Sequence, residues 1–528
     1  MEPTDGYTQE SGGLNLLKKG RRGLWRALFS RFGLILLLLF FQLGILIGVQ
    51  FRFQEYLPHY YSIMTAFSVV LVVYLLNSRQ DPTAKITWLV VILLLPAFGA
   101  LLYLYTQKDL GHRILKDRFA NISASTKDKI EQEPEALARF EQEAPEAVGL
   151  ARYLGRTGCH PVFTGTDVRY FPLGDDVFPE MLRQLEKAED FIFMEFFIVD
   201  EGLMWGRILE ILARKASEGV DVRLMYDGTC EFLLLPHDYP KRLRELGIQC
   251  KMFAPIAPFV STHYNYRDHR KILVIDGKAA FTGGVNLADE YINRRERFGH
   301  WKDTAVLLEG DAVRSLTLMF LQMWNVEEKE ADGDRFLTPA AQRREGRGFV
   351  IPYGDCPLDG ERVGEWVYMD MLNRARNYVY IMTPYLILDG EMETALKFAA
   401  ERGVDVRLIL PGIPDKKLAF ALAKTHYRSL LDSGVKIYEY SPGFVHAKVF
   451  LCDGREAVVG TINLDYRSLY HHFECAVYMH TTDCIKDIRE DFLQTQEKCR
   501  PVTEQTIREE KLLLKLEGAL MKVIAPLM

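Results

Sequence analysis

The sequence lacks an excess of basic residues, has few cysteines and contains no recognisable cofactor fingerprint. Its 528 residues include 65 Lys and Arg against 71 Asp and Glu, a net charge of −6, so no global positive field is available to hold nucleic acid. The eight cysteines are scattered without a CxxC pair, which argues against a zinc site or a disulfide framework. We therefore predict reduced core thiols and no nucleic-acid partner.

Metal-ligand spacings of carboxylates, His or Cys are also absent, as are phosphate-binding and dinucleotide-binding loops. This absence predicts metal-independent chemistry without a cofactor. With 48% hydrophobic and 26% charged residues, the chain is too apolar to be disordered and too long for a single ordinary domain. The sequence makes no prediction of an oligomeric state.

Charge is missing from two long stretches near the N-terminus, 32–49 and 86–105. A helix of about twenty residues rises about 30 Å, the thickness of the hydrocarbon core of a bilayer. A third uncharged run, 60–76, is shorter and contains Ser and Thr. Three such runs in succession fit neither a buried core helix nor a cleaved signal peptide. We predict two or three N-terminal transmembrane helices.

The topology of these helices depends on their number. Basic residues precede the first run and place the N-terminus in the cytoplasm by the positive-inside rule; they are Lys18, Lys19, Arg21, Arg22, Arg26 and Arg31. Two spans would return the rest of the chain to the cytoplasm, whereas three would leave it outside. The sequence is compatible with both, although free cysteines favour the cytoplasmic side.

An α/β pattern follows and occurs twice. The apolar strand 191–199, the helical stretch 204–218 and the strand 220–226 are followed later by 378–386, 391–402 and 404–410. The string Gly-Val-Asp-Val-Arg-Leu stands at 219–224 and again at 403–408, 184 residues later. Such self-similarity indicates an internal duplication.

These patterns predict seven segments along the chain. In order they are a basic N-terminal segment (1–31), a transmembrane region (32–105), a charged helical connector (106–154), a first α/β half (155–330), a linker (331–348), a second α/β half (349–500) and an amphipathic C-terminal helix (501–528). Packing of this last helix onto its own domain is favoured over docking at a membrane surface.

One motif in each half has the residues for chemistry. His269-x-Lys271-x4-Asp276 is followed by Gly283 and Asn286. The second half repeats each of these residue types 177 positions later, as His446, Lys448, Asp453, Gly460 and Asn463. A single copy would be a weak signal, but two copies in the same register within duplicated surroundings are specific.

The motif predicts a site for a phosphodiester. In a strand, His and Lys at i and i+2 point to one face, and a buried ammonium is costly without an anion. Lys271 and Lys448 would offset the charge on the phosphate, and Asn286 and Asn463 would donate hydrogen bonds to it. One histidine must be neutral to attack phosphorus, while the other must be protonated to serve as the acid.

Two acidic residues further along are candidates for orienting the histidines. Asp303 lies in HWKDTAV and Glu474 in HHFECAV, one in each half. Either carboxylate could accept a hydrogen bond from a histidine Nδ1 and fix its tautomer, as in a catalytic triad. The neighbouring His471 and His472 are interpreted as structural.

These motifs resemble the phospholipase D superfamily, whose HxKxxxxD-x6-G-x2-N pattern is matched twice. The tracts NYRDHRKILVIDGKAAFTGGVNLADEY and VHAKVFLCDGREAVVGTINLDYRSLYHHFE, and the last hydrophobic run, are similar to bacterial cardiolipin synthases in particular. The chain departs from the family at Gly284 and Thr461, where many members have Ser, and at Asp303, where the second half has the more usual Glu.

The resemblance implies two α/β halves related by a pseudo-twofold axis, with the active site at their interface. It implies double displacement: His269 attacks phosphatidylglycerol, His446 protonates the departing glycerol, and a second phosphatidylglycerol attacks the phosphatidyl-histidine to give cardiolipin. It further implies a multi-pass location in the bacterial cytoplasmic membrane and anionic phospholipids as partners. Asp276 and Asp453 are included among the catalytic residues.

Other functions remain open from the sequence. A hydrolase producing phosphatidic acid, or a transphosphatidylase making another phospholipid, would use the same residues. A nuclease is opposed by the apolar runs and the acidic net charge. A membrane-anchored binding protein with an inactive site is opposed by the presence of every His, Lys, Asp and Asn of both motifs.

Overall fold

The computed structural model describes residues 8–10, 13–16, 40, 44, 48, 57–78, 82–94, 99–100, 102–104, 110–158, 160–255, 266–328, 333–338 and 346–525. Two compact units are distinguished. The larger contains 1–17, 115–256 and 265–518, and the smaller contains 18–114, 257–264 and 519–528. Most of the predicted span 32–49, the basic cluster 18–31 and much of the predicted linker 331–348 lie outside the described residues.

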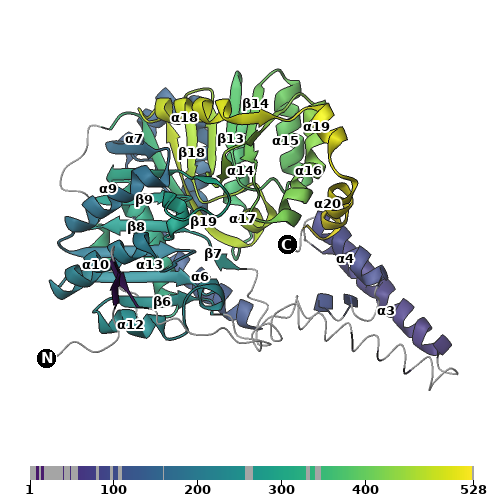
Figure 1. Ribbon diagram of the computed structural model, residues 1–528, viewed down its shortest axis with the longest axis horizontal. Coiled ribbons are helices and arrows are strands. Elements are labelled where there is room, and N and C mark those ends of the chain that lie inside the picture. The colour runs from purple at the N-terminus through teal and green to yellow at the C-terminus, as the bar shows by residue number, and fades with distance from the viewer. Residues whose placement is uncertain are drawn as a thin grey trace. The chain divides into compact units, whose positions relative to one another are not determined.

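Two mixed sheets form the centre of the larger unit (Figure 1). The first has the order β3 (Thr166–Phe171), β11 (Ala305–Gly310), β9 (Ala279–Gly283), β8 (Lys271–Ile275), β4 (Phe191–Phe196), β5 (Asp221–Asp227), β6 (Gln249–Phe253). The second has the order β12 (Phe349–Asp355), β19 (His472–His480), β18 (Glu456–Gly460), β17 (Val449–Cys452), β13 (Tyr378–Met382), β14 (Asp405–Pro411), β15 (Lys436–Tyr440), β20 (Cys499–Pro501). Apart from β20, the orders correspond strand for strand, which confirms the predicted pair of α/β halves.

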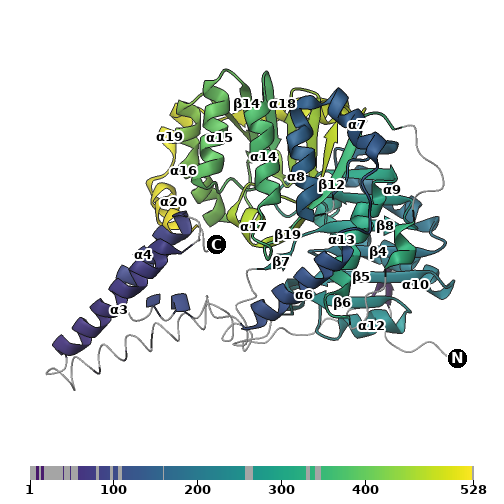
Figure 2. The ribbon, with the colours of Figure 1, turned by 180° about the vertical axis from the view of Figure 1, so that it is seen from behind.

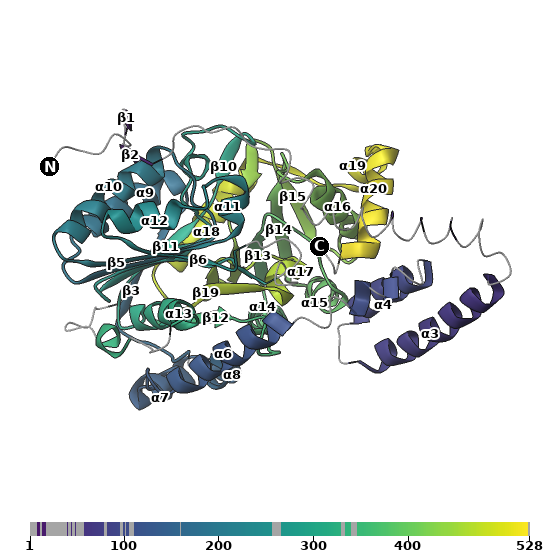
Figure 3. The same cartoon turned by 90° about the horizontal axis from the view of Figure 1, so that it is seen from below.

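Helices cover both faces of each sheet. On the first sheet, α9 (Gly174–Glu186), α10 (Leu203–Ser217) and α12 (Tyr239–Glu245) lie on one side and α13 (Val313–Asn325) on the other (Figure 3). On the second, α14 (Val363–Arg374), α15 (Gly390–Glu401) and α16 (Lys417–Asp432) lie on one side (Figure 2) and α18 (Ile485–Glu497) on the other. This double cover explains why β4 is buried at every residue and is apolar apart from Glu195.

The remaining described helices are shorter or lie at the ends. They are α6 (Leu110–Thr126), α7 (Pro134–Glu143), α8 (Val148–Gly158), α11 (Thr229–Leu233), α17 (Tyr466–Tyr470), α19 (Glu504–Glu509) and α20 (Leu512–Ile524). Helices α7 and α8 pack on the second sheet, where Phe140 and Leu154 join the same buried cluster as Phe349. The short strands β1 (Thr8–Glu10) and β2 (Gly13–Asn15) pair with each other.

Two short parallel pairings connect the halves. Strand β7 (Arg267–Asp268) of the first half pairs with β19 of the second, with Asp268 opposite Phe473. Strand β10 (His300–Lys302) of the first half pairs with β16 (Gly443–Val445) of the second, with Lys302 opposite Val445. Because His269 directly follows β7 and His446 directly follows β16, each motif begins against a strand of the other half.

The described part of the smaller unit is mainly two helices. Helices α3 (Leu57–Asn77) and α4 (Pro82–Leu94) share a buried cluster that includes Leu75, Trp88 and Ile92. Within the part of the chain that the structure describes, no helix combines the length and apolarity needed to cross a bilayer. Large apolar side chains are nonetheless exposed along α3, among them Ile63, Val70, Val73 and Tyr74.

Candidate active site

The two motif histidines are held at the junction of the halves by backbone hydrogen bonds. The His269 amide donates to the Phe473 carbonyl at 2.9 Å, and the His446 amide donates to the Lys302 carbonyl at 2.7 Å. Both side chains are buried, at 6% and 7% exposed. The pseudo-symmetry therefore extends from the strand order to the main chain that supports each imidazole.

Each histidine contacts the carboxylate of the other half. His269 Nδ1 lies 2.9 Å and 3.0 Å from the two Glu474 oxygens, and His446 Nδ1 lies 2.6 Å from Asp303 Oδ2. A carboxylate only accepts, so Nδ1–H donates and each Nε2 keeps its lone pair. The sequence nominated both acids without assigning either to a histidine; the structure pairs them crosswise.

Both carboxylates are ionised although they are fully buried. Burial raises the pKa of Asp303, but the charge that His446 acquires in acid, its hydrogen bond and the charge of Lys448 outweigh burial and hold that pKa below its ordinary value. Burial likewise raises the pKa of Glu474, and the charge and hydrogen bond of His269 lower it well below its usual range. Each imidazole is thus oriented by an acceptor that stays charged.

Burial favours the neutral form of both histidines. Burial lowers the pKa of His446 to about 4, with a further contribution from Lys448 that Asp303 opposes. Burial also lowers the pKa of His269, and Glu474 opposes that shift. A neutral imidazole has the lone pair that a nucleophile needs, so a group acting as the acid must acquire its proton when an anion binds.

The two lysines lie beside the histidines, as expected for residues i and i+2 of a strand. Lys271 Nζ donates to the His269 carbonyl at 2.6 Å, and Lys448 Nζ lies 3.0 Å from His446 Nδ1. Burial lowers the pKa of Lys271 to about 8 and that of Lys448 to about 7. Lys271 acts electrostatically on Lys448 and His446, so the four groups form one site.

The motif aspartates lie at the other end of their strands. Asp276 follows β8 and accepts hydrogen bonds from the amides of Glu189, Asp190 and Phe191 at 2.8–3.0 Å. Asp453 follows β17 and accepts from the amides of residues 376, 377 and 378, each at 2.8 Å. Both have φ of 51°, a left-handed conformation in which Asp is tolerated. The structure does not bring these two residues to the histidines.

The two motif asparagines differ in their contacts. Asn286 Oδ1 accepts from the Ile198 amide at 3.0 Å, and its Nδ2 donates to the Tyr291 hydroxyl at 2.8 Å. Asn463 is also buried, but its Oδ1 has no hydrogen-bond partner among the described residues. The two asparagines are therefore not equivalent, since the side-chain oxygen and nitrogen of Asn286 are both hydrogen-bonded within the protein.

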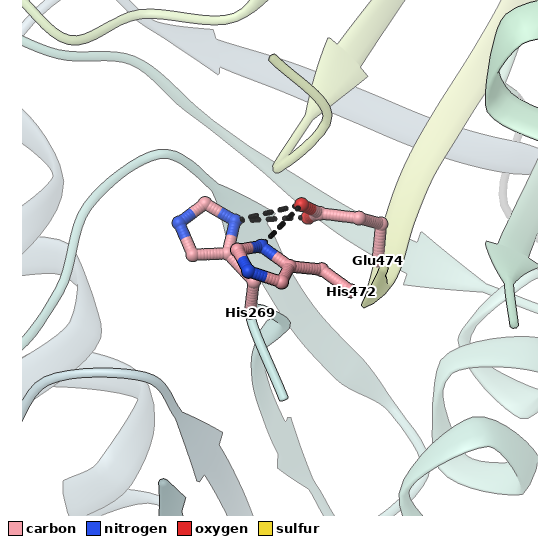
Figure 4. Close-up of side chains that lie close together, drawn as sticks. All are labelled: His269, His472 and Glu474. Carbon is pink, nitrogen blue, oxygen red and sulfur yellow. Dashed lines mark hydrogen bonds and ion pairs between the residues drawn. The ribbon is translucent and has the colours of Figure 1, made fainter. Parts of the chain in front are cut away.

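Two neighbours of the histidines were not nominated for the site: His472 was interpreted as structural from the sequence, and Trp301 was not considered. His472 lies against His269, with ring centroids 5.4 Å apart and its Nδ1 3.6 Å from Glu474 Oε1 (Figure 4). Trp301 lies against His446, with ring centroids 5.6 Å apart. Aligning HWKD with HHFE would have placed these two residues at matching positions, each two before the orienting acid.

Comparison with known families agrees with this geometry. The model described as "Cardiolipin synthase, PLD-like domain" matches residues 181–324 and 368–496. The chain belongs to this family. A second model, "Phospholipase_D-nuclease N-terminal", matches residues 66–106.

Curated relatives extend over nearly the whole chain. An uncharacterized protein of Streptococcus mutans is 58% identical over 457 residues, covering 87% of this chain and 99% of the relative. A cardiolipin synthase of Geobacillus sp. is 33% identical over 470 residues, covering 88% and 93%. Among solved structures, phosphatidylserine synthase of Haemophilus influenzae has a TM-score of 0.53 at 12% identity, covering 68% of this chain and 93% of that one, a likeness of fold alone.

Proposed function

We propose that this protein is a phosphatidyltransferase that converts two molecules of phosphatidylglycerol into cardiolipin and glycerol. The observation behind the proposal is the pair of buried histidines, each oriented by the ionised carboxylate of the opposite half. Its family membership, with cardiolipin synthases 33% identical over most of their length, supports the same substrate class. The chemistry requires only groups that the chain supplies.

In the first step the Nε2 lone pair of His269 attacks the phosphorus of phosphatidylglycerol. The bond between phosphorus and the glycerol oxygen breaks, and His446 gives its proton to that oxygen. Burial favours the neutral form of His446, and the negative charge of the bound phosphodiester favours its protonation. Glu474 stabilises the positive charge that develops on His269, as the carboxylate does in a triad.

In the second step a hydroxyl of another phosphatidylglycerol attacks the phosphatidyl-histidine. His446, now neutral, accepts the hydroxyl proton, the phosphorus–nitrogen bond breaks, and cardiolipin forms. The bonds made and broken at phosphorus are of similar kind on both sides, so no nucleotide is consumed. His446 returns to its protonated state, ready for the reverse or a further transfer.

The lysines and asparagines bind the phosphate in this scheme. Lys271 and Lys448 stabilise the charge on the non-bridging oxygens, and Asn463 and Asn286, both buried, would donate hydrogen bonds to them. Asp276 and Asp453 act as positioning residues. Asp276 binds the backbone amides at the start of β4, and Asp453 binds those at the start of β13. The assignment of His269 as the nucleophile rests on family resemblance.

The N-terminal region attaches the enzyme to the bacterial cytoplasmic membrane in two or three passes. Exposed apolar side chains along α3 and α4 support this attachment, because such surface is favourable only when it is removed from water. Anionic phospholipids would then be supplied within the membrane plane, with the catalytic unit on the cytoplasmic side favoured by its free cysteines.

The test is to incubate the membrane-bound protein with phosphatidylglycerol in excess chelator and to resolve the lipid and water-soluble products. Cardiolipin with an equal amount of free glycerol supports the transferase. Phosphatidic acid alone would identify a hydrolase, which the same residues could also support. Loss of wild-type activity on chelation would contradict the metal-independent mechanism.

A further inference from the structure

We infer that His269, His472 and Glu474 form a binding site for a divalent transition-metal ion such as Zn²⁺, and that occupation of this site inhibits the enzyme. His472 and Glu474 lie two residues apart on β19 of the second half, and His269 comes from the first half, directly after β7. One ligand atom from each lies within 4.8 Å of the others, and all three side chains are buried (Figure 4). Two imidazoles and a carboxylate are a common zinc ligand set.

The separations suit a small tetrahedral ion. Zinc–ligand bonds of about 2.0–2.2 Å at tetrahedral angles place neighbouring ligand atoms about 3.3 Å apart. His269 Nδ1 is 2.9 Å from Glu474 Oε1, and His472 Nδ1 is 3.6 Å from the same oxygen. These two distances lie on either side of the ideal edge, and the third edge, between the two imidazole nitrogens, is at most 4.8 Å. Metal binding would therefore bring the two imidazoles closer together.

His472 provides the second observation that points to a ligand. Its side chain is 8% exposed, and neither ring nitrogen has a hydrogen-bond partner within the described part of the chain. The nearest acceptor, Glu474 Oε1, lies 3.6 Å from Nδ1, too far for a hydrogen bond. A buried imidazole without a hydrogen bond is unfavourable, and a coordinated metal would satisfy its Nδ1. The positive charge of Lys271 disfavours a second cation nearby. The negative charges of Glu474 and Asp303, which also act on Lys271, offset that repulsion.

The site exists on one side of the pseudo-twofold axis only. The residue that corresponds to His472 beside His446 is Trp301, and its indole nitrogen is a donor with no lone pair for a metal. His446 therefore has one orienting carboxylate and an aromatic neighbour, whereas His269 has a carboxylate and a second imidazole. A metal ion would distinguish between the two duplicated halves.

Inhibition follows from what the metal would displace. An ion bound to Nδ1 of His269 takes the place of the proton donated to Glu474, and the neutral imidazole then has its single proton at Nε2. The lone pair that attacks phosphorus is no longer available, and Glu474, paired with the ion, no longer stabilises the charge that develops on the imidazole. This consequence rests on the proposed function, whereas metal binding itself does not.

Binding is tested on the full-length protein without lipid. Titration of chelator-stripped protein with Zn²⁺ by calorimetry, and with Co²⁺ followed by visible absorption, should reveal one site whose affinity falls at least tenfold in His472→Gln. The matched control, His237→Gln, removes an exposed histidine whose side chain is 79% exposed and should bind as the wild type does. Equal affinity in the wild type and His472→Gln would overturn the site.

Inhibition is tested separately in the transfer assay. Micromolar Zn²⁺ should slow the wild type reversibly, with full recovery in chelator, and His472→Gln should be at least tenfold less sensitive relative to its own rate in chelator. A wild-type rate unaffected by saturating Zn²⁺ would overturn the inhibition even if the variant does not fold. Zinc binding in a protein with no transferase activity would reject the proposed function and leave the metal site standing.

Discussion

Single residues give the two duplicated carboxylates different surroundings. The Thr461 hydroxyl donates to Glu474 Oε2, whereas the corresponding position beside Asp303 is Gly284. A Cβ atom at Gly284 would lie 2.0 Å from Asp303 Oδ1, closer than any real contact. The glycine thus leaves the space in which Asp303 reaches His446.

We predict that Gly284→Ala lowers transfer activity by about tenfold or more, because the new methyl group displaces Asp303 and frees the His446 imidazole. The rate is to be measured per folded molecule, with circular dichroism as the check on folding. Thr461→Ser, which keeps the hydroxyl beside Glu474, is the matched control and should retain most of the activity. A fully active Gly284→Ala would show that the close approach to Asp303 is unimportant.

The lysine pKa values predict an alkaline limit to the reaction. Burial lowers the pKa of Lys448 to about 7 and that of Lys271 to about 8, so both ammonium groups are charged below these values and neutral above them. Since kcat/KM reports the free enzyme, it should fall as the pH rises through about 7 to 8. A profile that stays flat to pH 9.5 would contradict the role of the lysines in binding the phosphate.

At the scale of elements, the strands of each sheet were predictable from the sequence, but the strand pairings between the two halves were not. The apolar run at 191–199 and the strands at 220–226 and 404–410 appear as β4, β5 and β14, with ends shifted by at most three residues, because burial on both faces leaves a continuous apolar pattern. The pairings of β7 with β19 and of β10 with β16 involve two or three residues each. Such short, distant pairings have no periodicity, and they decide which acid meets which histidine.

The positions of the motif aspartates relative to the histidines could not be predicted from the sequence either. Spacing grouped Asp276 with His269, yet the five residues of β8 separate them, and the carboxylate caps the turn that leads into β4. We predict that Asp276→Ala lowers the free energy of unfolding by about 2 kcal/mol, since it leaves three amides without their acceptor.

Denaturant titration measures this change, and Asp276→Asn, which also tolerates the left-handed φ, should lose less. Activity per folded molecule should remain within severalfold of the wild type for both substitutions. A loss of activity as large as that of a histidine variant, without loss of stability, would instead support the prediction that Asp276 is catalytic.

At the scale of the whole molecule, the duplicated catalytic unit and the helices α3 and α4 present different surfaces. The catalytic unit buries its apolar residues in clusters shared by both halves, whereas α3 presents Val70 and Tyr74 at 65% and 60% exposure. The internal repeat predicted that two domains build one site. The packing of α3 and α4 could not be predicted, because uniformly apolar runs have no polar face to fix their orientation.

We predict that Val70→Gln with Val73→Gln weakens membrane association, because each side chain contributes about 1.5 kcal/mol or more when it is removed from water. The measurement is the fraction of protein that sediments with membranes after high-salt and carbonate washes. Phe398→Gln alters an exposed apolar residue of the catalytic unit, 52% exposed, and should leave this fraction unchanged. An unaltered fraction for the α3 variant would show that other segments anchor the protein.

The most direct test of the central claim, transfer through a covalent histidine intermediate, is a rapid acid-free quench of the enzyme with phosphatidylglycerol labelled at phosphorus. The account predicts a labelled protein within a single turnover, with the label mapped to His269 and absent from His269→Ala. The label should disappear into cardiolipin when unlabelled phosphatidylglycerol is added. Product formation without any labelled protein, or label retained in His269→Ala, would contradict it.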